Sequence, residues 1–246
     1  MPEEFQLDDS LESAGSHASP GATQELDPSP SPHTEDLALA QLKNRDLSTQ
    51  DIEQLSQDSS TMKSRKVRMA VAAHPHTPRR IALRVIREFF TFELMQFAVT
   101  PAAAADLKRV ADELLISRLA SISLGERISL ARRSSQMVAG ALLVDKEQRV
   151  WQPALENARL TESSVVKALQ KSVSAPAFVE AVSHHSKWSV RPEIRMALLR
   201  NAHTPLARAI EFARNLPPSQ LRDILHTSRL PATIKDYLRK ITEGRK

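Results

Sequence analysis

The stretch Asn201-Ala202-His203-Thr204-Pro205 decides the fold, because it predicts a corner between two short helices. Asn tolerates the left-handed backbone that ends a helix, a Thr hydroxyl at an N-cap accepts a hydrogen bond from a free helix N–H, and proline fits the first helical position. The pattern recurs at His74-Pro75-His76-Thr77-Pro78, Val99-Thr100-Pro101 and Asn157-Ala158-Arg159-Leu160-Thr161, and more weakly at 44–48, 174–176 and 228–231. A chain of such corners predicts a helical repeat array.

The spacing of apolar residues predicts short helices from residue 35 onward. Most of them are too short to be stable alone, so they must pack against neighbouring helices. The predicted ranges are 35–43, 49–57, 63–73, 78–97 (with a break within it), 101–118, 123–133, 136–144, 146–156, 161–171, 176–184, 191–200, 205–214, 218–226 and 231–242.

Composition favours an all-α fold. The 246 residues include only five glycines, and aromatic residues make up 4% of the chain. Phosphate-binding loops and tight hairpins need glycine, and β-strands favour aromatic side chains. We therefore expect an all-α protein.

The chain contains no cysteine. This excludes disulfides, thiolate zinc sites, iron–sulfur ligation and cysteine nucleophiles. No apolar run approaches the ~18 residues of a membrane span, and the N-terminus lacks the pattern of a signal peptide. The sequence predicts no membrane insertion and a cytoplasmic location.

Charge is distributed unevenly along the chain. Residues 1–36 carry nine acidic side chains and no Lys or Arg, so the overall formal charge of +5 becomes +14 for residues 37–246. The Ser- and Pro-rich composition of 1–36 predicts a disordered acidic tail, with 37–246 as the solenoid. The tail is either a solvating segment or a self-masking segment that lies on the basic body.

Two stretches carry a family resemblance. Residues 141–150 followed by 155–161 resemble a unit of the HEAT-like or leucine-rich-repeat-variant proteins of bacterial type, and 197–206 repeats the ending of that unit. The resemblance covers about residues 130–240. It implies an all-α fold, a right-handed α-solenoid of short, irregular HEAT-like helical hairpins, that binds other macromolecules. Some leucine-rich-repeat-variant proteins hold an iron–sulfur cluster on clustered cysteines, and that feature does not carry over to a chain without cysteine.

The spacing between successive corners becomes irregular in the stretch 101–145. This stretch is predicted to contain a longer helix, and it holds Gly125 and Gly140. A bend, an insertion or a junction between two halves of a solenoid would each produce this irregularity.

No catalytic, metal or cofactor site emerges from the sequence. The close histidine pairs, His74 with His76 and His184 with His185, lack the three or four convergent ligands that a metal needs. No nucleophile elbow or paired-carboxylate pattern is present. We expect no catalytic residues, no bound metal and no cofactor.

Basic and aromatic residues provide the best candidates for partner contacts. At ~100° per residue, Arg80, Arg84 and Arg87 share one face of a helix. Arg191 and Arg195 form a second pair on a later helix, and Trp188 precedes them. Arginine faces can bind carboxylates or phosphates, and tryptophan beside arginine can anchor a partner. The alternative is a solvated face, with Trp188 packed between repeats.

The sequence therefore predicts a non-enzymatic scaffold or adaptor that binds a protein or peptide. The alternative is nucleic-acid binding by the basic body, with the acidic tail as a mask. That alternative resembles the HEAT-like DNA alkylation-repair glycosylases in fold and charge only, since no motif carries base-excision chemistry to residues of this chain. The oligomeric state is left open.

Overall fold

The computed structural model describes residues 32–171 and 175–243, and these residues form helices and turns without any strand. The acidic tail predicted for 1–36 lies outside the described residues as far as residue 31, whereas residues 32–36 belong to the first helix. The helices are α1 Pro32–Lys43, α2 Thr49–Gln57, α3 Ser59–Met62, α4 Arg65–Ala73, α5 Arg79–Arg87, α6 Thr91–Val99, α7 Ala105–Arg118, α8 Leu124–Arg133, α9 Gln136–Leu142, α10 Gln148–Leu155, α11 Glu162–Gln170, α12 Pro176–His184, α13 Pro192–Arg200, α14 Leu206–Arg214, α15 Pro218–Thr227 and α16 Ala232–Glu243.

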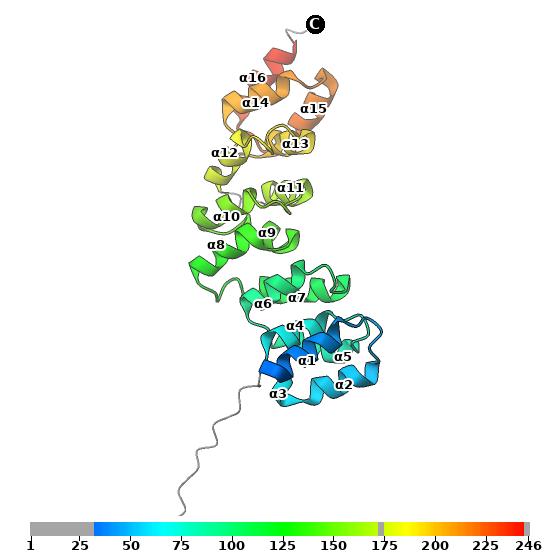
Figure 1. Cartoon of the computed structure of the whole chain (residues 1–246). Helices are drawn as coiled ribbons and strands as arrows, with labels where there is room; N and C mark the ends of the chain where they lie inside the picture. The colour runs from blue at the N-terminus through cyan, green and yellow to red at the C-terminus, as the bar shows by residue number, and fades with distance from the viewer. Residues whose placement is uncertain (1–31, 172–174, 244–246) are drawn as a thin grey trace, which may run out of the picture.

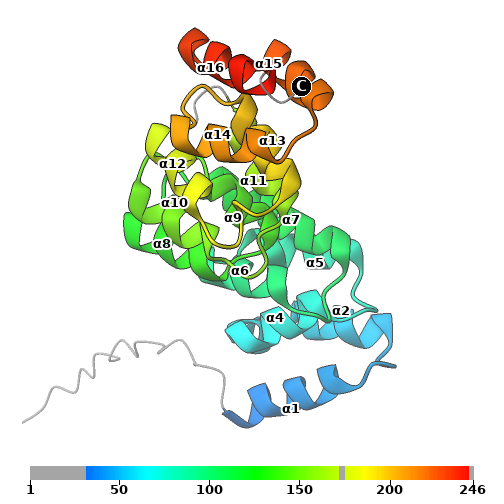
Figure 2. The same cartoon turned by 90° about the horizontal axis from the view of Figure 1, so that it is seen from above.

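The helices form an elongated stack of two layers (Figure 1). Alternate helices contact each other: α4, α6, α8, α10 and α12 follow one another in one layer, and α5, α7, α9, α11, α13 and α15 in the other. Consecutive helices such as α6 and α7 pack across the layers. The view from above again places α1 and α16 at opposite ends (Figure 2). The same alternation runs through 101–145, where α6 contacts α8 and α7 contacts α9.

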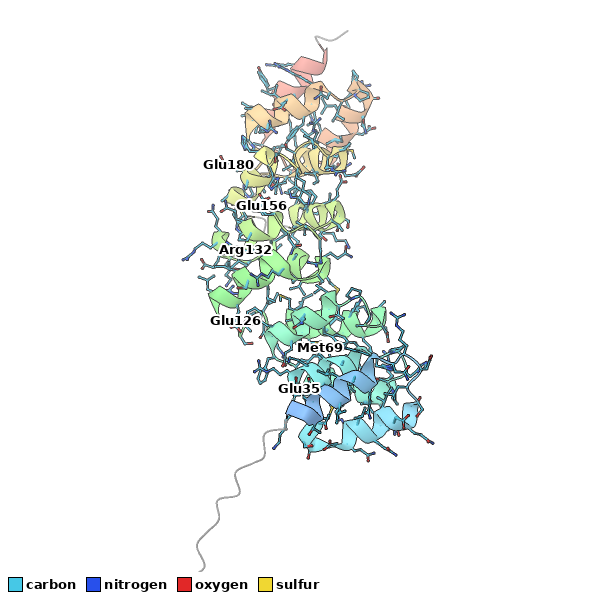
Figure 3. The ribbon with its side chains drawn as sticks, viewed as in Figure 1. Glu35, Met69, Glu126, Arg132, Glu156 and Glu180 are labelled. Carbon is cyan, nitrogen blue, oxygen red and sulfur yellow. The ribbon has the colours of Figure 1, made fainter. Side chains whose placement is uncertain are left out.

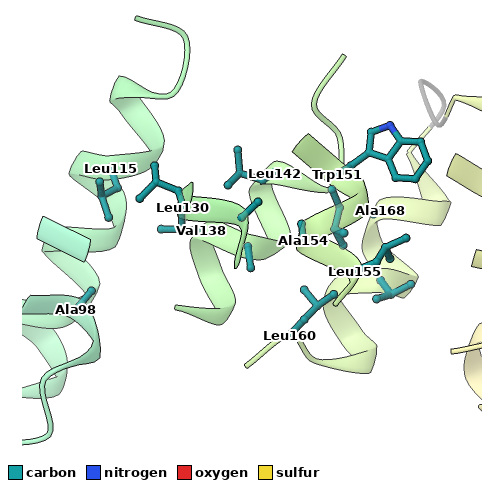
Figure 4. Packing of buried hydrophobic residues seen from close by; sticks show 14 of the residues in the cluster. Ala98, Leu115, Leu130, Val138, Leu142, Trp151, Ala154, Leu155, Leu160 and Ala168 are labelled. Carbon is teal, nitrogen blue, oxygen red and sulfur yellow. The ribbon is translucent and has the colours of Figure 1, made fainter. Parts of the chain in front are cut away.

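The core runs continuously between the layers. Figure 4 shows Leu115, Leu130 and Leu142 among the buried side chains that link α7, α8 and α9, and all three are at most 1% exposed. Gly140 on α9 lies in a tight contact, because a Cβ atom at this position would be 3.1 Å from the Ser164 hydroxyl of α11. Burial between neighbouring helices supplies the stability that such short helices lack alone.

The predicted helix 78–97 is broken into α5 and α6. Arg118 of α7 donates hydrogen bonds to the carbonyls of Phe89 (2.7 Å) and Arg87 (3.2 Å) at the end of α5. The Glu93 carboxylate accepts the backbone N–H of Phe90 (2.8 Å) at the start of α6. These bonds satisfy the backbone groups that a break in the helix exposes. Phe89, between the two helices, is buried in the core.

Within the described residues the predicted corners join successive helices, whereas residue 174 of the corner predicted at 174–176 lies outside them. The threonines act differently from our expectation. The N-caps of α5 and α14 are Pro78 and Pro205, and neither has a side-chain cap. The hydroxyl of Thr77 donates instead to the carbonyl of Val71 (2.5 Å), at the end of the preceding helix. Thr204 does the same with Leu198 (2.6 Å). The Thr-Pro pairs therefore close the C-terminal end of one helix rather than cap the next.

Asn201 also corrects the sequence prediction. Its φ of −88° and ψ of 137° are extended rather than left-handed. Its side-chain oxygen accepts the backbone N–H of His203 (2.9 Å), and its side-chain amide donates to the carbonyl of Leu169 (2.8 Å), the last helical turn of α11. The asparagine therefore stabilises its own corner and binds that corner to α11, the preceding helix of the same layer.

A buried carboxyl group in α7 makes stability depend on pH. Asp112 is 7% exposed, and this burial raises the pKa of its carboxyl group above the ordinary 3.8. A hydrogen bond from the Ser135 hydroxyl (2.7 Å) lowers the pKa, but by less than burial raises it. An acid with a raised pKa in the folded state stabilises the fold only while it is protonated, so this contribution is lost as the pH rises from about 3.8 through the raised pKa.

We expect Asp112→Asn to have a higher free energy of unfolding than the native chain at neutral pH. Asparagine keeps an acceptor for Ser135 without the charge, so the difference between the two proteins grows as the pH rises and then levels off. Urea unfolding of both proteins across this pH range measures the difference. A difference independent of pH would contradict the assignment.

Candidate functional site

A groove lies over α4, between α1 and α6, and has a volume of about 580 Å³. This volume is within the ~300–1,000 Å³ typical of ligand-binding clefts. Its apolar lining comes from all three helices and from the turns after α4 and α6. Figure 3 shows the side chains of this part of the stack, with Glu35 of α1 and Met69 of α4 labelled. The apolar lining consists of Leu42, Met69, Ala70, Ala73, Pro75, Phe92 and Ala102.

Cationic side chains border the groove. Lys43, Arg45, Arg65 and Lys66 line it, against the single carboxylate of Glu93. Lys66 is paired with Glu35 (3.2 Å), and Arg65 lies 3.4 Å from Glu93. Within the described part of the chain, Lys43 and Arg45 have no carboxylate partner. The groove therefore combines an apolar surface with an excess of positive charge.

Glu93 is held in the wall of the groove. Its side chain is 11% exposed, with one oxygen 3.4 Å from Arg65 and 3.5 Å from the guanidinium of Arg68. That oxygen is buried and has no hydrogen-bond partner within the described residues, while the other accepts the N–H of Phe90. The two arginines offset the charge of this buried carboxylate.

Two exposed phenylalanines adjoin the groove at the start of α6. Phe92, which lines it, is 46% exposed, and Phe90 is 63% exposed with the Arg65 guanidinium 5.7 Å from its ring centre. Exposed aromatic side chains beside cations are common at binding surfaces. The four phenylalanines at 89, 90, 92 and 97 gave a sequence signal for this feature, because one helix face cannot bury all of them.

The predicted arginine face forms a different and smaller surface. Arg80 and Arg84 line a hollow of about 370 Å³ between α2 and α5. Arg80 is paired with Glu53 at 2.6 Å, so part of its charge is already neutralised. Arg87 is exposed on the next turn of α5. The structure brings Arg80 and Arg84 together, but it adds no apolar surface comparable to that of the α4 groove.

Trp188 is not a surface residue, which corrects the prediction that it contacts a partner. It is 2% exposed, its indole N–H donates to the carbonyl of Leu155 (2.9 Å), and the Lys187 ammonium lies 4.2 Å from the centre of its ring. It packs between neighbouring hairpins, the alternative that the sequence left open.

The second arginine pair is only partly available. Arg195 is half-buried, donates to the carbonyl of Ser189 (2.7 Å), and lies 5.5 Å from the ring centre of Phe212. Arg191 is exposed and occupies the N-cap position of α13. These residues lie in the upper half of the stack in Figure 1, whereas the α4 groove lies near its lower end. The six predicted contact residues therefore do not form one surface.

The corner histidines bind backbone groups rather than converge on a metal. His74 lies 3.0 Å from the carbonyl of Asn44, and His76 lies 3.1 Å from the carbonyl of Leu47. The described residues contain no group of three or more His, Asp or Glu side chains arranged to hold a metal ion. Over the same residues, no helix has both the length and the apolar character needed to cross a membrane.

Comparisons of the chain with protein-family models, with curated proteins and with solved structures give no match. Function is therefore inferred from the geometry and charge of the α4 groove.

Proposed function

We propose that this protein is a non-enzymatic scaffold of the right-handed α-solenoid type that binds acidic, partly apolar segments of partner proteins in the α4 groove. The alternating contacts between helices support the solenoid arrangement, since solenoids stack hairpins and contact only their neighbours. The observation that carries the binding proposal is the apolar groove whose bordering Lys43 and Arg45 lack carboxylate partners within the described residues.

The chemistry of the groove favours a peptide over a nucleic acid. Single-stranded nucleic acids bind by stacking bases on several aromatic rings along a cationic track. Here Phe92 is the one Phe, Tyr or Trp side chain in the lining, and the ring of His74, which also lines the groove, is largely buried. The other apolar lining residues are Leu, Met, Ala and Pro side chains. Aliphatic side chains of a peptide pack well on such a surface, and methionine adapts to varied partners.

The proposal is tested by titrating the full-length protein with two sets of fluorescent dodecapeptides. In one set Glu and Asp alternate with Leu and Phe, and in the other Lys replaces the acidic residues. We expect the acidic set to bind at least about tenfold more tightly, a difference of about 1.4 kcal/mol. A single-stranded uridine oligonucleotide serves as the third probe, and tighter binding of this probe would favour the nucleic-acid alternative instead.

Charge reversal locates the binding surface. We expect Lys43→Glu combined with Arg45→Glu to weaken binding of the acidic peptides at least about tenfold, because attraction is replaced by repulsion. The matched control is Arg84→Glu combined with Arg87→Glu, which changes the net charge equally on exposed positions of α5. If only the control variant lost affinity for the acidic peptides, the binding surface would be the arginine face of α5. That result would contradict the assignment of the α4 groove.

A further inference from the structure

We propose that residues 1–12 of this chain occupy the α4 groove as an internal ligand that competes with partner segments. The inference rests on the proposed function of the groove and adds its regulation. Three observations on the molecule carry it: the composition of the segment, the point at which the described chain begins, and the unpaired charge of the groove.

The composition of residues 1–12 complements the groove. The segment contains five acidic residues and no Lys or Arg. Phe5, Leu7 and Leu11 lie between these acidic residues. Phe5 and Leu7 share a face in an extended backbone, and Leu7 and Leu11 share a face in a helix. In either form the segment offers two large apolar side chains together with carboxylates. Those are the groups that an apolar groove bordered by Lys43 and Arg45 would bind.

The rest of the N-terminal segment is less suited to the groove. Residues 13–24 contain Ser, Ala, Gly, Pro, Thr, His and Gln, without an acidic residue or a large apolar one. Leu26 is the one large apolar residue between 13 and 31, and prolines follow it at 28 and 30. Residues 1–12 therefore hold Phe5, Leu7, Leu11 and five of the seven acidic residues of 1–31, whereas 13–31 hold only Glu25, Leu26 and Asp27 of these kinds and form the connection.

The described chain begins beside the groove. Glu35, in the first turn of α1, is paired with Lys66, which lines the groove. The 12 residues of α1 are about 18 Å long, from Pro32 to Lys43. Residues 13–31 span at most about 65 Å when extended, so residues 1–12 can reach any part of the groove.

Covalent attachment makes even a weak contact effective. A segment tethered by a short connection has an effective concentration on the order of mM at a nearby site. Residues 1–12 therefore need only mM affinity for the α4 groove to occupy it in their own chain. A partner segment must bind the groove more tightly than this to displace them. The expected consequence is an increase in affinity for acidic peptides when the charges of residues 1–12 are removed.

A spin label tests the location directly. Because the chain has no cysteine, Gln6→Cys in the full-length protein creates a single attachment site for a nitroxide between Phe5 and Leu7. The readout is the intensity of the methionine methyl NMR signals. We expect the Met69 signal to lose at least half the intensity that it has in the same protein after the nitroxide is reduced. The signals of Met137 on α9 and Met196 on α13 should keep their intensity.

Charge reversal supplies the controls. Lys43→Glu combined with Arg45→Glu should restore the Met69 signal, and Arg84→Glu combined with Arg87→Glu should leave it weakened. An unaffected Met69 signal, or equal losses at Met69 and Met196, overturns the proposal. So does a loss seen when a spin-labelled chain is mixed with a separate isotope-labelled chain, because the occupant would then be a second copy.

The two proposals fail separately. If acidic peptides bind in the groove but the label leaves Met69 unchanged, the internal ligand is refuted and the scaffold function stands. If neither the peptides nor the labelled segment affects Met69, both proposals are wrong.

Discussion

Replacement of Trp188 by alanine is expected to lower the free energy of unfolding by about 3–5 kcal/mol, the usual effect of truncating a large buried aromatic side chain. Trp188 is 2% exposed, and its indole N–H binds the carbonyl of Leu155, so its loss leaves a cavity and an unpaired buried carbonyl between two hairpins. Urea unfolding followed by far-ultraviolet circular dichroism measures the change.

Two variants separate the contributions of Trp188. Trp188→Phe keeps most of the ring but removes the indole donor, so we expect a smaller loss of about 1–3 kcal/mol. Val190→Ala, at a position that is 57% exposed, should change stability by no more than about 0.5 kcal/mol. If Trp188→Ala were as mild as Val190→Ala, the indole would lie outside the core, and a direct role in partner binding would be restored.

Asn157→Ala is expected to lower the free energy of unfolding by about 2–3 kcal/mol. Asn157 is 2% exposed, and its amide donates to the carbonyls of Ala131 (2.9 Å) and Ser134 (3.3 Å) at the end of α8. Its side-chain oxygen accepts the N–H of Arg159 (2.8 Å). Alanine leaves these buried groups without partners, and each unpaired group costs about 1–3 kcal/mol unless the structure relaxes.

Asn44→Ala is the matched control. The Asn44 side chain accepts the N–H of Asp46 (3.1 Å) in the same way, but it is exposed, and among the described residues its amide donates no bond to a neighbouring hairpin. We expect a loss of about 0.5–1 kcal/mol. Thermal and urea unfolding of both variants measure the difference. Equal losses would show that the turn alone, rather than the bond between hairpins, determines the effect of Asn157.

Local sequence features predicted the helices well. The apolar spacing identified nearly all of them, and the Thr-Pro pairs and the asparagines at 157 and 201 marked several of their corners. The short helix α3 was missed, because the four residues Ser59–Met62 are too few to show a period. The role of Thr77 was also missed. A threonine before proline can cap the following helix or bind the preceding one, and the choice depends on the angle between the two helices.

The candidate site was much less predictable than the fold. The groove is lined by residues between 42 and 102, from three helices and the turns after them. Their convergence depends on how α1 and α6 pack on α4, which no local pattern records. Arg84 and Arg87 are exposed, as charged residues on one helix face usually are, and their contact with a partner stays a prediction. Burial of Trp188 was not assigned, since its partner Leu155 lies 33 residues away.

The most direct measurement is a titration of the isotope-labelled full-length protein with the tightest acidic dodecapeptide, followed by the methionine methyl signals. Binding in the α4 groove predicts that the Met69 signal shifts to saturation, while the Met137 and Met196 signals stay in place, and that Lys43→Glu combined with Arg45→Glu abolishes the shift. A saturating shift at Met196 with none at Met69 would contradict the assignment of the groove as the binding surface.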